Sequence, residues 1–599
     1  MLLALLLVAL PLPDADVVNL AHELSGEIAK RNLEGLARFH RQRGSQGFDS
    51  AAQLVLDRAK AYGLRDAEVL RFPTDGKIFY GTQRSRPGWD ALLAELWEVR
   101  GEKIASWDAE PISLAEDSES ANVTAPLIDV GDGTRETDYA GKDVKGKIVL
   151  VSAQPGEVQD LAVGKFGAAG IVSCAQNQKT AWWGEDENLV RWGHLETFSP
   201  NKTFAFMVSL KTARRFRERL SKGETIRLQA TVKAGQHPSN YEVVTATIPG
   251  SDPRLRNEEI ALSCHLDHQR PGANDNASGC VTILEVARTL RMLIDEKKLP
   301  RPARTLRFIW PPEVEGTETL LSARPELAQR IKAVIHLDMV GGGPTTKTVF
   351  HVTRGPASLP SFVHEVAWQI ASFVNEQSYA FAATGSAPLP FVAPTGGKEA
   401  LLAQDSPHSM GSDHDVYQDS SFRIPAVYLN DWPDRYIHTN FDSAANIDPT
   451  KLLRAAFIAA ATAIALADEK PDVAWTTPMP ARTSRCEAAG CAVYRRRPSP
   501  KGPLAVFGYD YLTDHLKSAR LPLPKLLDWQ PPRSTPFSLQ PEFATSEQYT
   551  YEILNFVDGV RTAQSIRDAV SAEYGPIPLD LVLDYLRALG SAGVIEPAH

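Results

Sequence analysis

The sequence predicts an α/β fold over about residues 240–470, with one sheet covered by helices on both faces. Short apolar runs that read as strands alternate there with longer amphipathic runs that read as helices, a pattern typical of a sheet packed between helices. Polar loops follow several strand-like runs, and α/β folds carry their catalytic groups on such loops. The strand-like runs are residues 260–263, 305–310, 333–337 and 426–429, and the helix-like runs are 280–293 and 452–467.

The segment before residue 240 divides into two parts. Residues 17–119 read as the opening part of the same domain, with a helical pattern from Ser50 to Tyr62 that ends at Gly63. Residues 120–235 have a strand-helix-strand rhythm of their own, with apolar strands at 148–151 and 171–172. We expect this part to fold as a compact β-rich insert, and residues 236–470 to form the main domain.

The residue composition changes after Asp472. Residues 471–545 are rich in proline and read as a linker and extended packing segment, and residues 546–599 read as a small helical module. Cys486 and Cys491 lie in one short loop and could pair in an oxidising compartment. A zinc knuckle is the rival interpretation, but a second Cys or His pair is missing nearby.

The composition is that of a globular protein, with 43% hydrophobic and 23% charged residues. A net charge of -9 argues against a nucleic-acid partner. Met1 to Leu10 is apolar and ends at prolines, so residues 1–16 read as an export signal that is too short to span a membrane. The alternative is a buried N-terminal helix. We expect a secreted or periplasmic protein with no stable membrane span.

The most informative polar loop follows the strand-like run 260–263. His265 and Asp275 stand ten residues apart, and an imidazole nitrogen with a carboxylate oxygen is a ligand mixture that zinc accepts. Asp267 is placed to accept the other imidazole N–H and fix its tautomer. Taken alone, His265 is more simply explained as part of an ordinary polar loop.

Similar groups follow the later strand-like runs. Glu313 comes after the run ending at Trp310, Asp338 comes after the run ending at Leu337, and His438 follows the last run. Loops at the carboxyl ends of neighbouring strands meet at one edge of a sheet. We therefore expect these side chains to converge on a metal site.

These motifs together resemble the two-zinc aminopeptidase family, peptidase family M28. The resemblance covers residues ~30–470 and rests on His-x-Asp, Gly-Ala-x-Asp-Asn-x-Ser-Gly, Pro-Glu, Leu-Asp-Met and His-Thr in that order. It implies a three-layer α/β/α zinc-exopeptidase sheet, and residues 120–235 resemble the protease-associated domain often inserted into it. By this resemblance His265 and Asp338 hold one zinc, Asp275 bridges, His438 holds the second, and Glu313 is the general base.

The chain departs from the family pattern beside the base. The family has a second acidic residue there as a ligand of the second zinc, and this chain has Val314 followed by Glu315. Glu315 could reach the metal, the second site could be weak, or one zinc could suffice; Glu315 as an ordinary carboxylate is an equal alternative. Asp413 and His414 resemble the family's substrate-pocket segment, and a loop-stabilising role is an equal alternative for them.

The sequence therefore predicts a zinc-dependent exopeptidase with one or two ions that acts on peptides, most simply as an aminopeptidase. The alternatives are a carboxypeptidase or dipeptidase of the same fold, with Arg423 or Arg435 for the substrate carboxylate, and a catalytically inactive binding protein. The C-terminal stretch around Asn555–Thr562 is similar to PqqD-like winged-helix modules, which implies docking of a peptide or protein.

Overall fold

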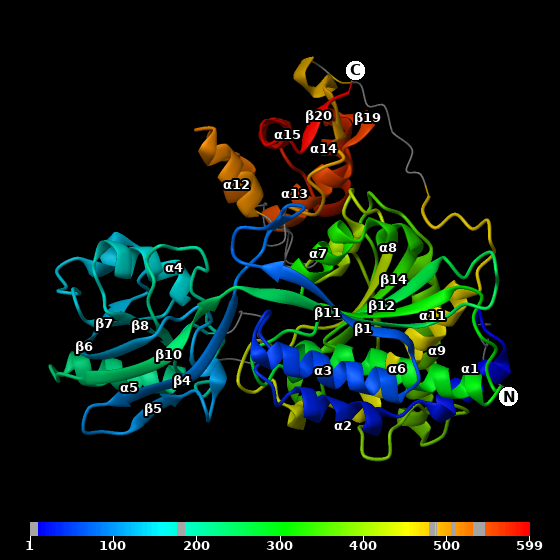
Figure 1. Ribbon diagram of the computed structural model, residues 1–599, viewed down its shortest axis with the longest axis horizontal. Coiled ribbons are helices and arrows are strands. Elements are labelled where there is room, and N and C mark those ends of the chain that lie inside the picture. The colour runs from blue at the N-terminus through cyan, green and yellow to red at the C-terminus, as the bar shows by residue number, and fades with distance from the viewer. Residues whose placement is uncertain are drawn as a thin grey trace.

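The computed structural model describes residues 10–176, 186–477, 486, 488–504, 509–530 and 545–598. Figure 1 shows three units: a large α/β unit, a β-rich unit beside it, and a small C-terminal unit above it. Residues 1–9, which hold most of the apolar part of the expected export signal, lie outside the described residues. Leu12, just after them, is buried in the core of the large unit.

The large unit is built on a mixed eight-stranded sheet. Four neighbouring strands at its centre run parallel, and this arrangement brings their carboxyl ends to one edge. In order across the sheet, the strands are β1 (Arg65–Thr74), β11 (Ser239–Ile248), β13 (Thr305–Trp310), β12 (Glu259–Ser263), β14 (Ile331–Asp338), β17 (Ala426–Trp432), β15 (Val349–Thr353) and β16 (Gln404–Ser406).

Helices cover both faces of this sheet (Figure 1). One face packs in a single core cluster with α1 (Asp14–Glu23), α2 (Gly26–Leu36), α3 (Gln46–Ala61), α6 (Gly279–Asp295), α9 (Val363–Thr384) and α11 (Pro449–Ala467). The other face packs against α7 (Glu315–Ala323), α8 (Pro325–Arg330) and α10 (His414–Gln418). Successive strand residues point to opposite faces, so Leu262 joins the first cluster and Ala261 the second. The predicted three-layer α/β/α architecture is confirmed.

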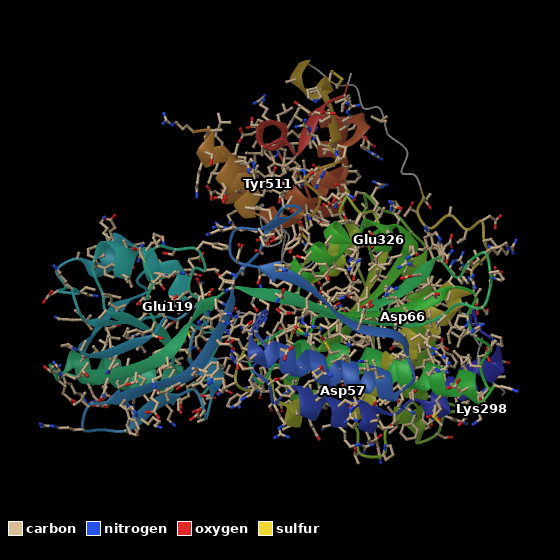
Figure 2. The ribbon with its side chains drawn as sticks, in the orientation of Figure 1. Asp57, Asp66, Glu119, Lys298, Glu326 and Tyr511 are labelled. Carbon is tan, nitrogen blue, oxygen red and sulfur yellow. A yellow bond between two sulfur atoms is a disulfide. The ribbon has the colours of Figure 1, made fainter. Side chains whose placement is uncertain are left out.

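Helix α3 shows how local sequence sets an element. The Ser45 hydroxyl accepts the Phe48 N–H at 3.1 Å and so caps the helix start. Phe48 and Val55 face the core, whereas Asp57 points to solvent, as Figure 2 shows. The helix therefore begins where its cap stands, and its apolar stripe fixes which side meets the sheet.

Helix α11 is long and apolar enough to cross a membrane, but 94% of its most apolar window is buried inside the protein. It packs between α2, α6 and α9. Its composition is explained by that central place, since a helix surrounded by other elements is apolar all round.

The β-rich unit contains a seven-stranded sheet with helices α4 (Pro155–Gln159) and α5 (Leu210–Ser221). Its strands in order are β5 (Lys103–Ser106), β4 (Gly88–Glu98), β10 (Arg227–His237), β6 (Ala121–Gly131), β7 (Ile148–Val151), β8 (Gly170–Ser173) and β9 (Ala205–Met207). β4 and β5 precede residue 120 yet belong to this sheet, because β4 pairs with the long strand β10 and β5 pairs with β4. The insert therefore starts near Gly88, and the expected boundary at 120 is too late.

The C-terminal unit combines helices with a three-stranded sheet in the order β19 (Asp558–Thr562), β18 (Val493–Arg496) and β20 (Ile595–Pro597). Its helices are α12 (Tyr509–Ser518), α13 (Ser546–Asn555), α14 (Ala563–Tyr574) and α15 (Leu579–Ser591). β18 and α12 lie in the stretch expected to be a linker. Leu512 and Leu516 are buried in the core of this unit, so the unit begins well before residue 546. Cys486 and Cys491 form a disulfide.

A short hairpin and several helical turns complete the described elements. The hairpin is β2 (Phe79–Tyr80) with β3 (Gln83–Arg84), and it contacts α7 and α12. The 3-10 turns are Pro111–Ser113, Glu136–Tyr139, Pro344–Thr346, Ala444–Asn446, Ala488–Cys491 and Lys525–Asp528, and the π-type turns are Asp160–Lys165 and Ala273–Ser278.

Candidate metal centre and active site

The predicted site residues meet at the carboxyl edge of the central parallel strands. His265 follows β12, Glu313 follows β13, and Asp338 is the last residue of β14. His438 follows β17, and Asp275 lies on the loop between β12 and α6. These loops and strand ends bring the five side chains into one neighbourhood.

One ligand group forms around the Nε2 atom of His265. This atom lies 3.2 Å from Asp275 Oδ1, 3.4 Å from Asp338 Oδ1 and 3.9 Å from Glu313 Oε1. Ser412 donates its hydroxyl to the other oxygen of Asp338 at 2.8 Å, so the Asp338 carboxylate is held in place. Such outer contacts orient metal ligands.

A second ligand group forms around the other oxygen of Asp275. Asp275 Oδ2 lies 2.9 Å from His438 Nε2 and 3.3 Å from His268 Nε2. Asp275 thus faces both groups, one with each carboxylate oxygen, which is the arrangement of a bridging ligand. Burial opposes ionisation of Asp275, but the histidines around it hold its pKa well below the usual range.

The chemistry of these groups fits metal ions. Within the described residues, His265 Nε2, His268 Nε2 and Asp338 Oδ1 are buried without a hydrogen-bond partner. Leaving such atoms unpaired is costly, and all three face the groups of imidazole and carboxylate just described. Imidazole nitrogen with carboxylate oxygen is a donor set of zinc. The residues present therefore fit zinc at both groups.

Asp267 supports the site in a different way from that expected. The Nδ1–H of His265 donates to the backbone carbonyl of Asp267 at 3.0 Å, while the carboxylate oxygen lies 3.5 Å away. The Asp267 carboxylate instead accepts the Glu313 N–H at 2.6 Å and the Arg43 guanidinium at 3.1 Å. Asp267 thus positions the Glu313 backbone, and its main chain sets the His265 tautomer.

Glu313 occupies the accessible side of the site. Its side chain is 18% exposed, as is that of His438, whereas the side chains of His265 and Asp275 are 2% and 7% exposed. Burial and the neighbouring carboxylates raise the pKa of Glu313 well above its usual range, although His265 opposes the shift. Glu313 is thus a largely buried carboxyl group that lies beside the first ligand group.

Glu315 lies in an ion-pair cluster apart from both ligand groups. Its oxygens contact Arg86 Nε at 2.8 Å and Arg43 Nη1 at 3.3 Å, and the Tyr241 hydroxyl donates to it at 2.6 Å. The carboxylate is 1% exposed and its oxygens are engaged by these partners. The structure thus gives Glu315 a structural role and does not bring it to either ligand group, contrary to the interpretation that it is a ligand.

Asp413 and His414 point to different places. Asp413 accepts the Val314 N–H at 2.9 Å behind the Glu313 turn, and burial raises its pKa to about 7. His414 stacks on Tyr428 and lies in a separate buried group with His408 and Asp415. Asp413 therefore supports the base, and His414 lies outside the two ligand groups.

Two residues at the site were not singled out from the sequence. His268 follows His265 by three positions, and its proximity to an established motif was the available signal. Trp192 belongs to the β-rich unit, and its ring stacks on His438 at 3.6 Å and on His268 at 5.0 Å between centroids. The sequence holds no signal for Trp192, since it stands far from the motif residues along the chain.

Comparison with known proteins agrees with this geometry. The model of peptidase family M28 matches residues 243–463. Leucine aminopeptidase 1 of Pyrenophora tritici-repentis is 29% identical over 173 residues, which are 26% of this chain and 43% of that protein. The chain thus spans less than half the length of this curated relative.

Solved structures share the fold at low identity. The peptidase M28 precursor of Shewanella amazonensis SB2B has a TM-score of 0.55 and 15% identity, covering 78% of this chain and 98% of its own. BSAP, a zinc aminopeptidase from Bacillus subtilis, has a TM-score of 0.50 and 18% identity, covering 73% of this chain and 94% of its own. Residues 243–463, which match the model of peptidase family M28, carry every member of the two ligand groups.

Proposed function

We propose that the protein is a zinc-dependent aminopeptidase that hydrolyses the N-terminal residue from peptides. The observation that carries the proposal is the shared carboxylate of Asp275, which faces His265 and Asp338 with one side and His438 with the other, while Glu313 stands at the accessible edge. The family match of residues 243–463 supports the same reaction class.

When bound, zinc lowers the pKa of a water ligand and polarises the scissile carbonyl. The Glu313 carboxylate accepts the proton of the attacking water and returns it to the leaving amine. Asp267 and Asp413 hold the backbone on either side of Glu313, through the N–H groups of Glu313 and Val314. The general base therefore sits on a turn that is fixed from two directions.

Neither of the two arginines considered for the carboxylate of a carboxypeptidase substrate is well placed for that role. Arg423 precedes β17 and so lies at the opposite end of that strand from His438. Arg435 stands near the site, and Asp186 lies 3.5 Å from its guanidinium. A carboxypeptidase needs a cation for the substrate carboxylate, and the two arginines considered for it are placed away from the site or beside an acid.

The experiment is the variant Glu313→Gln assayed on aminoacyl chromogenic substrates and on N-blocked peptides. We expect kcat to fall by about 10²–10⁴-fold, because the proton acceptor is lost while the ligands stay. Zinc content by elemental analysis should not change. Glu326→Gln, on the exposed face of α8 (Figure 2), is the matched control. Unchanged turnover in Glu313→Gln would refute the mechanism, and cleavage of N-blocked peptides from the carboxyl end would refute the aminopeptidase assignment.

We also propose that the protein is exported to a secreted or periplasmic location. The apolar stretch from Met1 to Leu10 and the disulfide between Cys486 and Cys491 support this, since disulfides persist in oxidising compartments. Fractionation of cells that express the full chain tests it, and recovery only in the cytosolic fraction would contradict it.

A further inference from the structure

We infer that His268 is a protein ligand of the second zinc ion, together with Asp275 and His438, and that it replaces the acidic ligand missing at Val314. This rests on the proposed zinc chemistry and concerns how the centre is completed in this chain. Without His268, the second group would contain only one imidazole and one shared carboxylate.

The orientation of the His268 ring supports this role. Its Nδ1–H donates to the Gln269 carbonyl at 2.7 Å, which leaves the Nε2 lone pair free for a metal. That Nε2 atom is buried, has no hydrogen-bond partner and lies 3.3 Å from Asp275 Oδ2. Tetrahedral zinc with bonds of about 2.0–2.1 Å places its ligand atoms at similar separations.

The surrounding chain is built to hold this ring. The backbone of His268 exchanges two hydrogen bonds with Arg41, at 3.0 and 3.1 Å. The buried Arg41 side chain donates to the carbonyls of Leu266, Pro271 and Gly272, so it clamps the loop on both sides of His268.

Gly272 is required at its position for the same reason. Its φ of 52° is left-handed, and a Cβ there would lie 2.5 Å from His268 Nδ1. The glycine thus gives the imidazole room beside the loop. Trp192 closes the other side by stacking on His268 and His438 at interplanar angles of 19° and 20°.

Val314, which stands where the family pattern has an acid, is the central residue of a tight turn. Val314 has φ 54° and ψ -62°, and the Glu315 N–H reaches back to the Glu313 carbonyl at 2.5 Å, which is a γ-turn of the rare form. A β-branched residue with positive φ is strained, and such strain is retained where a site needs the geometry. The Val314 side chain packs in the core with Tyr241 and Leu320. The turn therefore positions Glu313, and His268 supplies the ligand that Val314 cannot.

The replacement changes the chemistry of the second site. Two imidazoles and one shared carboxylate make it richer in nitrogen and less negative than a site with a second carboxylate. Imidazole suits zinc, whereas carboxylate and water suit Mn²⁺ and Mg²⁺. We therefore infer that the second site of this chain discriminates against Mn²⁺.

The test measures metal binding rather than turnover. The full chain, dialysed free of metal and titrated with Zn²⁺, should bind two equivalents, His268→Ala one, and the buried-histidine control His364→Ala two. His268→Glu should recover the second equivalent and bind Mn²⁺ at least tenfold more tightly than the unaltered chain. Circular dichroism of each variant reports its fold.

Two equivalents in His268→Ala at unchanged affinity would overturn the inference, as would loss of both equivalents in a folded variant. A single equivalent in the unaltered chain would also overturn it, and would leave the proposed peptidase intact as a one-metal enzyme. If His268→Ala does not fold, His268→Glu decides, since failure to bind a second equivalent in that folded variant counts against the inference. All of these outcomes are measured as metal binding. Failure of the proposed function would instead appear in the turnover of Glu313→Gln.

Discussion

At the scale of single residues, the acids around β13 have separate tasks. Glu313 faces the ligand groups, whereas Glu315, two residues later, is turned towards Arg43 and Arg86. The γ-turn at Val314 produces this separation, because it reverses the chain direction within three residues. Two carboxylates so close in sequence therefore differ completely in function.

Glu315→Gln tests this division. We expect it to destabilise the protein by about 3 kcal/mol, because a buried ion pair that loses one partner leaves uncompensated charge on the other. Zinc stoichiometry should stay as in the unaltered chain. Thermal unfolding and elemental analysis of the same preparation give both values. Loss of one zinc equivalent in this variant would restore Glu315 as a ligand.

The predicted residues were those whose position follows from strand order. His265, Glu313 and His438 follow the carboxyl ends of neighbouring strands and Asp338 ends one, so the order of the strands brings them together. His268 was missed because its direction depends on Arg41 and Gly272, and neither contact is visible in local sequence. The placement of Glu315 depends in the same way on arginines more than 200 positions away.

At the scale of elements, the start of α3 links helix stability to the site. Ser45 caps the helix, and only Gly44 separates it from Arg43, which contacts Asp267 and Glu315. The cap therefore lies close in sequence to a residue that contacts Asp267, which holds the Glu313 backbone.

Ser45→Ala should destabilise the large unit by about 1 kcal/mol, the usual cost of losing an N-cap side chain. Ser50→Ala, whose exposed hydroxyl bonds only the Gln46 carbonyl, is the matched control and should change little. Differential scanning calorimetry measures both. Equal transition temperatures for the two variants would contradict the capping role.

Element boundaries were predictable only where the pattern was strong. The strands at 305–310 and 426–429 were recognised from apolar runs, and the structure has β13 and β17 there. β4 has a mixed burial pattern and was read as part of the first domain, although it pairs with β10. β18 stands in a proline-rich stretch, and its pairing partners lie more than 60 residues further on.

At the scale of the whole molecule, the β-rich unit and the C-terminal unit both lie against the large α/β unit (Figure 1). The β-rich unit reaches the metal groups through Trp192, and the C-terminal unit packs against the large unit through Tyr551, whose hydroxyl donates to the Asp415 carbonyl at 2.7 Å. The C-terminal unit thus packs on the large unit of the same chain. Its expected docking of a separate peptide or protein stays a prediction.

The contact between these two units carries an acidic pair. Glu552 accepts the N–H and hydroxyl of Ser358, and Glu573 accepts the Ala357 N–H. Burial, followed by the Glu552 charge, raises the pKa of Glu573 well above its ordinary value of 4.5. The protonated form is thus favoured in the folded state, so its contribution to stability is complete below pH 4.5 and is lost as pH rises through the raised pKa.

Glu573→Gln should remove this dependence. We expect the variant to melt at a higher temperature than the unaltered chain at pH 8 and at the same temperature at pH 4.5, because the amide cannot acquire the charge. Thermal melting across that range, with Glu326→Gln as the control, measures the difference. A parallel fall of both curves above pH 4.5 would contradict the assignment to Glu573.

Trp192 links the β-rich unit directly to the second ligand group. Its indole stacks on two imidazoles of the second group, and the backbone N–H of Trp192 donates to the His438 carbonyl at 2.8 Å. If metal binding orders these two histidines, it also favours the contact of the β-rich unit with them. By reciprocity, that contact then raises the metal affinity by the same factor. Metal binding at the second group and the contact of the β-rich unit with that group would therefore strengthen each other.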